Sequence, residues 1–430
     1  MKENYLLKSE RAYSIYARYA KDLPIIDYHN HLSVEDIKNN RRYKNITELW
    51  LASDPYKHRL MRMSGVDEKY ITGDSSDFEK FEKFCEIFPM LIGTPVYDWS
   101  RMELSRVFGI EQLPSKDTAK YIFEKTGELL SCDGYSFNEI LGRFNVEYQS
   151  PVAEIFADLS LFSEAKTAPS LRGDSLLTPD AALKSQLEAK SGVSITDMNS
   201  YISAISVLID EFEKAGTKIA DHSLDDGFFA GGADSESVKI LVRLGVEYSK
   251  RGWTMLLHLG AKRKTSDRLR ALAGAAGGYA ATGNSFDISS LCDMLGEMER
   301  SGGLPRTVLF PLNMSDAGSL AVMSGSFSED GVGGKIQIGP PWWWCDHAFG
   351  IKNAFDSISS FGLLSQFIGM TTDSRSILSF VRHDYFRRLL CNWLVEKDER
   401  EDLGLTDEVM GELVRKICYE NARSRVEENK

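Results

Sequence analysis

Hydrophobic and polar residues follow two different rhythms along the chain, and the change falls near residue 140. In the first part, Ser76-Asp77-Phe78-Glu79 is a capping box, and the helix it begins carries Phe81, Cys85 and Phe88 on one face. After Phe144, short apolar or β-branched runs alternate with helical stretches. This alternation is typical of repeated βα units and a parallel sheet.

The apolar runs predict eight strands that alternate with helices, which would close as a distorted (β/α)8 barrel. We place these strands at residues 24–28, 145–148, 166–171, 217–221, 254–259, 307–312, 335–339 and 367–372. The chain then divides into an N-terminal helix with the first strand (1–32), a helical insertion (33–140), and the remaining barrel with C-terminal helices (141–430). An insertion this long, directly after the first strand, is expected to cover the site.

The first predicted strand ends in His29-Asn30-His31, just before a helix start at Ser33-Val34-Glu35-Asp36. Side chains alternate along a strand, so His29 and His31 point to the same face and could hold one metal ion. The alternative is a strand with two hydrogen-bonded histidines and no metal. In α/β barrels the C-terminal ends of the strands carry the chemistry.

Other polar residues follow other predicted strands. Asp373 comes after the last strand, which lies beside the first in a closed barrel, so it could complete a metal site with an open coordination position or simply cap the next helix. His258 ends the fifth strand, and Arg172 and Arg375 follow the third and eighth. Arginine binds carboxylates through two parallel hydrogen bonds. Trp343, in a run of three tryptophans, could line a sugar pocket or cap the barrel.

Composition narrows the classes of function. The 430 residues carry a formal net charge of -12 with a pI near 5.3, so we expect no nucleic-acid surface. No apolar run reaches the length of a membrane span or has the form of a signal peptide, which favours a cytoplasmic protein without a membrane partner. The six cysteines form no Cys-x-x-Cys pair and are expected to be reduced.

Several motifs, in order along most of the chain, resemble the uronate isomerase (glucuronate isomerase) family of the amidohydrolase superfamily. They are Asp27-Tyr28-His29-Asn30-His31-Leu32, Asp54-Pro55-Tyr56-Lys57-His58-Arg59, Ile92-Gly93-Thr94-Pro95, Ala220-Asp221-His222-Ser223-Leu224, His258-Leu259-Gly260-Ala261-Lys262-Arg263, Gly369-Met370-Thr371-Thr372-Asp373-Ser374-Arg375 and Arg382-His383-Asp384-Tyr385. The resemblance implies a barrel of amidohydrolase type. It also implies interconversion of D-glucuronate or D-galacturonate with D-fructuronate or D-tagaturonate through a cis-enediolate.

The same resemblance implies roles for individual residues. His29, His31 and Asp373 would hold one divalent metal ion, with zinc as the first expectation and manganese or iron as alternatives. Asp373, or a water on the metal, would move protons, while Tyr56 and Arg375 would stabilise the enediolate. Arg172 would grip the substrate carboxylate, with Arg375, His258 and Trp343 also in the substrate site. The expected partner is a small-molecule uronate; a homo-oligomer is left open.

The chain departs from the family pattern at three places, which we expect to lie near the pocket. Pro55 and His58 replace the histidine and tryptophan of an Asp-His-Tyr-Lys-Trp-Arg run, Gln149 and Ser150 replace an Asp pair, and Asp98 replaces the histidine of Tyr-His-Trp. Two alternatives to the isomerase follow. One is a metal-dependent hydrolase, which should carry a histidine at the end of the sixth strand, where none stands; the other is a sugar-acid-binding relative without catalysis.

Overall fold

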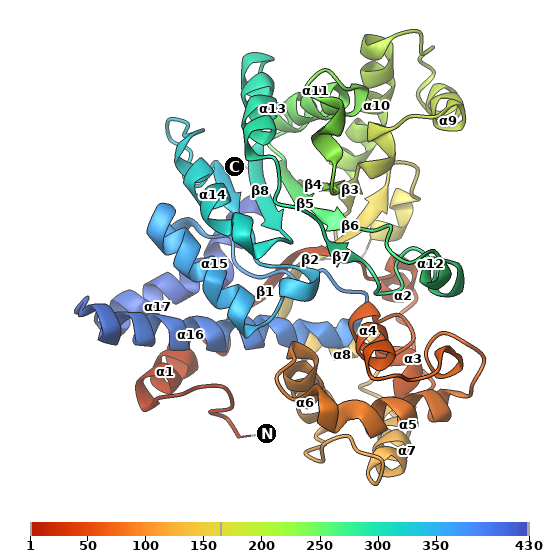
Figure 1. Ribbon diagram of the computed structural model, residues 1–430, viewed down its shortest axis with the longest axis vertical. Helices are drawn as coiled ribbons and strands as arrows, with labels where there is room; N and C mark the ends of the chain where they lie inside the picture. The colour runs from red at the N-terminus through yellow and green to blue at the C-terminus, as the bar shows by residue number, and fades with distance from the viewer. Residues whose placement is uncertain (1, 164–165, 428–430) are drawn as a thin grey trace.

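A curled sheet of seven parallel strands forms the centre of the protein, as the computed structural model, which describes residues 2–163 and 166–427, shows (Figure 1). Neighbouring strands follow one another in chain order, except that a small antiparallel pair, β6 (Ala261–Lys262) and β7 (Ala281–Thr282), stands apart. The strands of the main sheet are β1 (Ile25–Asn30), β2 (Val146–Glu154), β3 (Ser170–Arg172), β4 (Ile219–Leu224), β5 (Thr254–Leu259), β8 (Arg306–Pro311) and β9 (Ile336–Ile338).

The register of the sheet brings the ends of its strands together. Thr254 at the start of β5 pairs with Ile219 of β4 on one side and with Arg306 of β8 on the other. All six residues of β5 are buried, as expected for a parallel strand covered on both faces. The C-terminal ends of these strands therefore lie on one edge of the sheet and their N-terminal ends on the opposite edge.

The segment 367–372 closes the barrel without forming a regular strand, which corrects the prediction of eight. On one side, Ile368 donates its backbone N–H to the side chain of Gln337 in β9 (2.9 Å). On the other, Thr372 donates its N–H to the side chain of Asp27 in β1 (2.7 Å), and Asp373 donates to the carbonyl of His29 (3.2 Å). Side chains thus replace most backbone partners, a pattern that apolar periodicity does not reveal.

One glycine is required in this closing segment. Gly369 has φ +83°, in the left-handed region, and a Cβ there would lie 2.0 Å from the carbonyl oxygen of Ile417. The carbonyl of Gly369 in turn accepts the hydroxyl hydrogen bond of Tyr28 (2.9 Å). The closing segment is therefore held tightly between β1 and the C-terminal helices.

Residues 33–140, all of which are described, contain helices and no strand, and these helices lie together at one end of the molecule (Figure 1). Ser76 and Glu79 form the expected capping box at the start of α5. The helices are α2 (Val34–Lys38), α3 (Ile46–Trp50), α4 (Pro55–Met63), α5 (Asp77–Ile87), α6 (Pro95–Phe108), α7 (Ala119–Ser131) and α8 (Phe137–Gly142).

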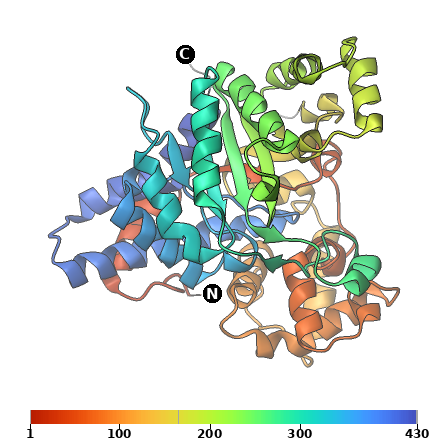
Figure 2. The same ribbon diagram turned by 45° about the horizontal axis from the view of Figure 1, so that its top comes forward.

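Of the remaining helices, α9–α11 lie on one side of the sheet and α14–α17 on another, while α12 lies beside the helices of residues 33–140 (Figure 1 and Figure 2). Their bounds are α9 (Ala181–Ser191), α10 (Met198–Lys214), α11 (Glu236–Lys250), α12 (Asp267–Ala273), α13 (Ile288–Arg300), α14 (Ala317–Val322), α15 (Ala348–Phe361), α16 (Val381–Glu401), α17 (Asp407–Arg415) and α18 (Asn421–Val426). The expected N-terminal helix is present. It consists of α1 (Glu10–Ile15) and the π-helical turn that follows it (Tyr16–Ala20). None of the described helices is long and apolar enough to cross a membrane.

Candidate active site

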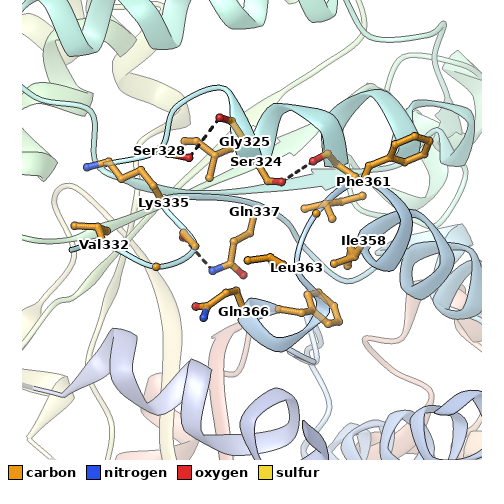
Figure 3. A pocket seen from close by; sticks show the side chains of 17 residues that line it. Ser324, Gly325, Ser328, Val332, Lys335, Gln337, Ile358, Phe361, Leu363 and Gln366 are labelled. Atoms are coloured by element: carbon orange, nitrogen blue, oxygen red, sulfur yellow. Dashed lines mark hydrogen bonds between the residues drawn. The ribbon is translucent and has the colours of Figure 1, made fainter. Parts of the chain in front are cut away.

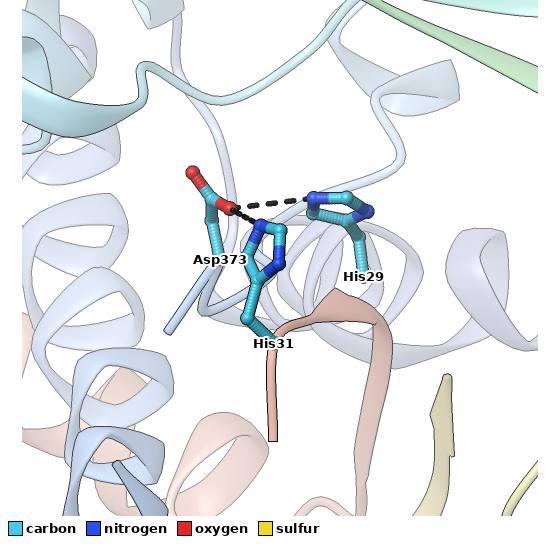
Figure 4. A group of neighbouring side chains, drawn as sticks. All are labelled: His29, His31 and Asp373. Atoms are coloured by element: carbon cyan, nitrogen blue, oxygen red, sulfur yellow. Dashed lines mark ion pairs between the residues drawn. The ribbon is translucent and has the colours of Figure 1, made fainter. Parts of the chain in front are cut away.

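His29, His31 and Asp373 converge at the C-terminal end of β1 (Figure 4). The Nε2 atoms of His29 and His31 lie 3.3 and 3.1 Å from the same carboxylate oxygen, Oδ1 of Asp373. Asp373 adopts φ +45°, a left-handed conformation that is uncommon for a residue with a side chain. This left-handed residue lies where the closing segment meets β1, since its N–H donates to the carbonyl of His29.

The geometry of these three residues fits a divalent metal ion. Ligand atoms at 2.0–2.1 Å from a tetrahedral ion lie about 3.4 Å apart, close to the separations seen here. The other carboxylate oxygen of Asp373, Oδ2, is buried without a hydrogen-bond partner among the described residues. A bound cation would balance the carboxylate in this buried position.

The charges in this group suit metal binding. Burial lowers the pKa of His31 to about 4, so this imidazole is neutral at neutral pH. Burial alone would lower the pKa of His29, but the carboxylates of Asp221 and Asp373 outweigh it and raise the pKa. For Asp373, burial would raise the pKa, but hydrogen bonds from both histidines hold it well below the usual range. Both carboxylates thus favour a positive charge at His29.

A second buried group adjoins the first through His29. The carboxylate of Asp221 lies 2.7 Å from Nδ1 of His258, and His258 Nε2 has no partner among the described residues. Both residues share a face because Ser223 of β4 lies directly opposite His258 of β5. His29, Asp221 and His258 also place ligand atoms within 4.8 Å of one another. His258 thus has one nitrogen fixed by a carboxylate and the other available.

Tyr56 enters the site from the helical insertion. Its ring is flanked edge-on by Trp99 and Trp344, and the Arg382 guanidinium lies 4.6 Å from its centre. The hydroxyl is buried without a partner in the described chain, and burial raises its pKa, so it remains protonated. The packing therefore fixes the Tyr56 hydroxyl in place, and no described residue accepts its hydrogen bond.

Three arginines line the same pocket as the metal group. Arg172 is held by Asp174, with 3.2 Å between Nε and Oδ2, whereas Arg375 is exposed and has no ion pair within the described residues. Arg263, which the sequence did not single out as a site residue, contacts Asp225 at 2.9 Å. Its guanidinium lies 4.8 Å from the ring centre of Trp343. The pocket therefore offers several donors for a carboxylate.

The three adjacent tryptophans, 342–344, each pack against a different residue of the pocket. Trp343 lines the pocket under Arg263, while Trp342 packs edge-on against His258, with ring centres 4.7 Å apart. Trp344 packs against Tyr56 and donates its N–H to the carbonyl of Ala280 (2.8 Å). Trp342 and Trp343 thus line the pocket, and Trp344 supports Tyr56 from behind.

Not every residue considered from the sequence lies at the site. His222, which the sequence left as a candidate similar to His258, points to the outer face of the sheet and shares a 3.0 Å hydrogen bond with Tyr248. Asp221 and Arg263 line the pocket, although in the sequence they stood out only as members of longer motifs. Asp221 lies two residues before Ser223 and therefore on the same face of β4. This places it near His258 only because β4 pairs with β5 so that Ser223 lies opposite His258.

Of the residues that depart from the family pattern, Pro55 lines the pocket and the others are not among its described lining residues. Asp98 accepts a hydrogen bond from Tyr5, and His58 is buried on the same helix as Tyr56. In β2, Gln149 donates to the hydroxyl of Thr167 (3.1 Å) and Ser150 donates to the carbonyl of Ala168 (3.0 Å). The changes in β2 therefore serve contacts with the next strand.

A larger cavity, of about 440 Å³, lies elsewhere, between α14, β9 and α15 (Figure 3). It is lined by apolar and amide side chains such as Ile358, Phe361 and Gln337, with Lys335 as its charged member. No cluster of histidines and carboxylates lines it. The chemistry of the chain is therefore concentrated in the smaller, polar pocket.

An α/β barrel whose strand ends carry a His-His-Asp group and several arginines defines a class: barrel enzymes with a site suited to a metal ion and a small acidic molecule. Comparison with known proteins gives the particular family. The family model described as glucuronate isomerase matches residues 1–243 and 235–425. The chain therefore belongs to the uronate isomerase family.

Individual relatives agree over the full length. A uronate isomerase from Caldanaerobacter subterraneus subsp. tengcongensis is 37% identical over 457 aligned residues, which cover 98% of each chain. The crystal structure of a uronate isomerase from Thermotoga maritima superimposes with a TM-score of 0.89 at 26% identity and covers 99% of both chains. A glucuronate isomerase from Caulobacter crescentus shares the fold, with a TM-score of 0.88, 21% identity, and 99% and 96% of the two chains covered.

Proposed function

We propose that this chain is an aldose-ketose isomerase that interconverts D-glucuronate or D-galacturonate with D-fructuronate or D-tagaturonate. The observation that carries the proposal is the polar pocket in which His29, His31 and Asp373 meet Tyr56 and a set of arginines. Membership of the uronate isomerase family supports the same activity. The hydrolase alternative is not favoured, since β8 ends in Phe310-Pro311 without a histidine.

His29, His31 and Asp373 would hold one divalent ion, with zinc first and manganese or iron as alternatives. When bound, the ion supplies positive charge that orients oxygen atoms of the substrate. The two oxygens of Asp373 have different surroundings: Oδ1 faces both histidines, while Oδ2 is buried and unpartnered in the described structure. One oxygen can therefore serve as a ligand while the other has no protein partner in the described structure.

The isomerisation needs a base that takes the proton from C2 and returns it to C1, and a group that stabilises the enediolate between the two steps. The proton of the C2 hydroxyl passes to the C1 oxygen, which lies on the same side of the cis-enediolate. We assign the transfer from C2 to C1 to Asp373 through its unpartnered Oδ2. The protonated hydroxyl of Tyr56 and the guanidinium of Arg375 stabilise the negative charge that develops on the substrate oxygen. His258, held by Asp221, presents Nε2 to a substrate hydroxyl.

Arg172 grips the carboxylate that distinguishes a uronate from a neutral sugar. Its guanidinium is oriented by Asp174, so less side-chain entropy is lost when the substrate binds. Trp343 provides an apolar face for the sugar, backed by Arg263. Together these residues select an anionic sugar by charge and shape.

The test is to incubate the metal-loaded protein in heavy water with a panel of uronates and to follow deuterium at C1 and C2 by NMR. We expect exchange and net conversion with at least one uronate. Glucose and galactose, which lack the carboxylate, are the matched controls and should show neither. Binding of uronates without any exchange, despite a filled metal site, would favour the non-catalytic alternative and overturn the proposal.

The division into residues 1–32, 33–140 and 141–430 belongs to the same proposal. In it, the helical insertion supplies Tyr56 and covers a pocket whose other groups come from the barrel. A cytoplasmic location and a small-molecule uronate as the partner complete it. Expression of the chain with a fluorescent tag would test the location.

A further inference from the structure

A second polar pocket, of about 230 Å³, lies at the opposite edge of the sheet from the candidate active site. It is formed where β4, β5 and β8 begin, and the terminal helix α18 covers it. In a chain with a net charge of -12, basic side chains outnumber acidic ones in its lining. Its charged residues are Lys218, Arg251, Arg306, Lys335 and Arg425 with Glu329 and Glu427.

Arg425 is the centre of this pocket. Its side chain is 8% exposed, and its Nε and Nη1 have no hydrogen-bond partner within residues 2–163 and 166–427. Only Nη2 is engaged, by the carbonyls of Gly333 (3.4 Å) and Gly334 (3.1 Å). A buried guanidinium with unpaired donors is costly unless an anion satisfies them.

Arg306, at the start of β8, adds a like charge beside Arg425. Burial and the positive charge of Arg306 lower the pKa of Arg425 to about 10. Backbone pairing fixes the neighbours: Thr254 donates its N–H to the carbonyl of Lys218 (2.9 Å), and Thr307 donates to that of Lys335 (2.8 Å). The basic residues are therefore carried by adjacent strand starts of a rigid sheet.

The acidic residues neutralise only part of this charge. Of the two acidic lining residues, Glu329 pairs with Lys335 and Glu427 pairs with Arg423 (2.7 Å). Arg251 is paired at 2.8 Å with Glu247, which lies outside the pocket lining. Lys218 and Arg306, in contrast, have no ion pair or side-chain hydrogen bond within the described part of the chain. The pocket therefore holds three cationic side chains whose charge the described protein does not balance.

We propose that this pocket is a binding site for a tetrahedral oxyanion, inorganic phosphate or a phosphate monoester, held by Arg425, Arg306 and Lys218. A cavity of about 230 Å³ can take such an anion together with water, whose share of liquid volume is about 30 Å³ per molecule. Guanidinium groups bind phosphate oxygens through charge-assisted hydrogen bonds. The bound anion ties α18 to the starts of β4 and β8, and so stabilises the barrel from the face opposite the active site.

The test is calorimetric titration of the metal-loaded, full-length protein with inorganic phosphate at constant ionic strength, and separately with glycerol phosphate. We expect one site, and Arg306→Gln or Arg425→Gln should weaken it about tenfold or more, because each removes a charge-assisted hydrogen bond. Tighter binding of glycerol phosphate than of phosphate would identify a monoester as the natural ligand; the reverse would identify free phosphate.

Two controls separate this site from other anion binding. Arg243→Gln changes an exposed arginine of α11 that donates to Asn199 (2.9 Å) outside the pocket lining, and it should alter the affinity less than about twofold. Asp373→Asn alters the metal group and should leave phosphate binding intact, so failure of the proposed isomerase activity would not affect this result. Equal loss in Arg243→Gln, or loss in Asp373→Asn, would overturn the proposal.

Thermal unfolding gives a second readout if Arg425→Gln folds poorly. In phosphate-free chloride buffer, Arg306→Gln should melt at or above the temperature of the unaltered chain, because it removes like-charge repulsion next to Arg425. Added phosphate should raise the melting temperature of the unaltered chain more than that of the variant. Equal shifts in both would contradict the site.

Discussion

Asp27→Asn is the substitution that most directly tests how the barrel closes. Asp27 is fully buried and accepts hydrogen bonds from both residues of the closing segment that precede Asp373. Its Oδ1 accepts from the N–H of Thr372 (2.7 Å) and from Thr371 Oγ1 (3.0 Å), and its Oδ2 accepts from Asn30 Nδ2 (2.8 Å) and from Thr372 Oγ1 (2.8 Å). His383 Nε2 also lies 3.1 Å from Oδ1.

An amide at this position can accept on only one side. If its oxygen faces Thr372 N, its NH2 group faces Asn30 Nδ2, and Asn30 cannot turn freely because its oxygen already accepts from Leu32 N at 3.1 Å. Two charge-assisted hydrogen bonds are then lost or replaced by donor-donor contacts. At about 1.5–3 kcal/mol for each hydrogen bond, the free energy of unfolding should fall by about 3–6 kcal/mol.

The loss should also reach the metal group, because Thr371 and Thr372 position Asp373 beside β1. We expect a lower thermal midpoint and weaker binding of zinc or manganese to the metal-free variant, measured by calorimetry. The matched control is Asp287→Asn, the same chemical change at an exposed helix N-cap that accepts from Ser290 N at 3.0 Å. Asparagine is as good an N-cap as aspartate, so this control should be nearly neutral.

The outcome that refutes this reasoning is specific. The free energy of unfolding of Asp27→Asn could lie within about 1 kcal/mol of that of the unaltered chain, with equal metal affinity. In that case the hydrogen bonds of the Asp27 side chain do not hold the closing segment. If stability falls but metal affinity does not, the hydrogen bonds of Asp27 support the fold without positioning Asp373. Either result would separate barrel closure from the site.

Four further predictions concern the site. Asp373→Asn should lose both bound metal, measured by elemental analysis, and turnover; full metal content would refute the ligand role. His258→Gln should keep the metal but lower kcat/KM about a hundredfold or more in uronate isomerisation assays, as expected for a group that contacts the substrate in the transition state. Arg172→Lys should raise KM about tenfold with a small change in kcat, because the planar fork is lost. Metal affinity should rise from about pH 6 to pH 8 with release of a proton, seen by calorimetry in two buffers, because the pKa of His29 is raised above 6.5 and its neutral form binds metal.

The arrangement of strands and the His-x-His pair could be read from the sequence because both depend on local periodicity. Residues two apart in an extended segment share a face whatever the rest of the fold does, so His29 and His31 were predicted together, although β1 itself ends at Asn30. Capping at Ser33 and Ser76 is equally local, and both serines accept the expected backbone hydrogen bonds. Apolar runs placed the seven regular strands for the same reason.

Tertiary structure decided which distant residues meet. Asp221 and His258 belong to different strands, and their contact depends on the register between β4 and β5, which no short motif specifies. The closing segment 367–372 is apolar like a strand, yet side chains of Asp27 and Gln337 provide partners that backbones provide elsewhere. Periodicity describes one chain segment at a time, whereas these contacts depend on the packing of several.

The basic pocket shows the same division at the other edge of the sheet. Lys218, Arg306 and Arg425 are separated along the chain and stand in no motif, so nothing in the sequence pointed to this pocket, and the acidic net charge argued against it. Parallel strands bring their starts to one edge, and the terminal helix adds its arginine there. Composition sums charges over the whole chain, but only the fold determines where like charges are brought together and left to be balanced by an anion.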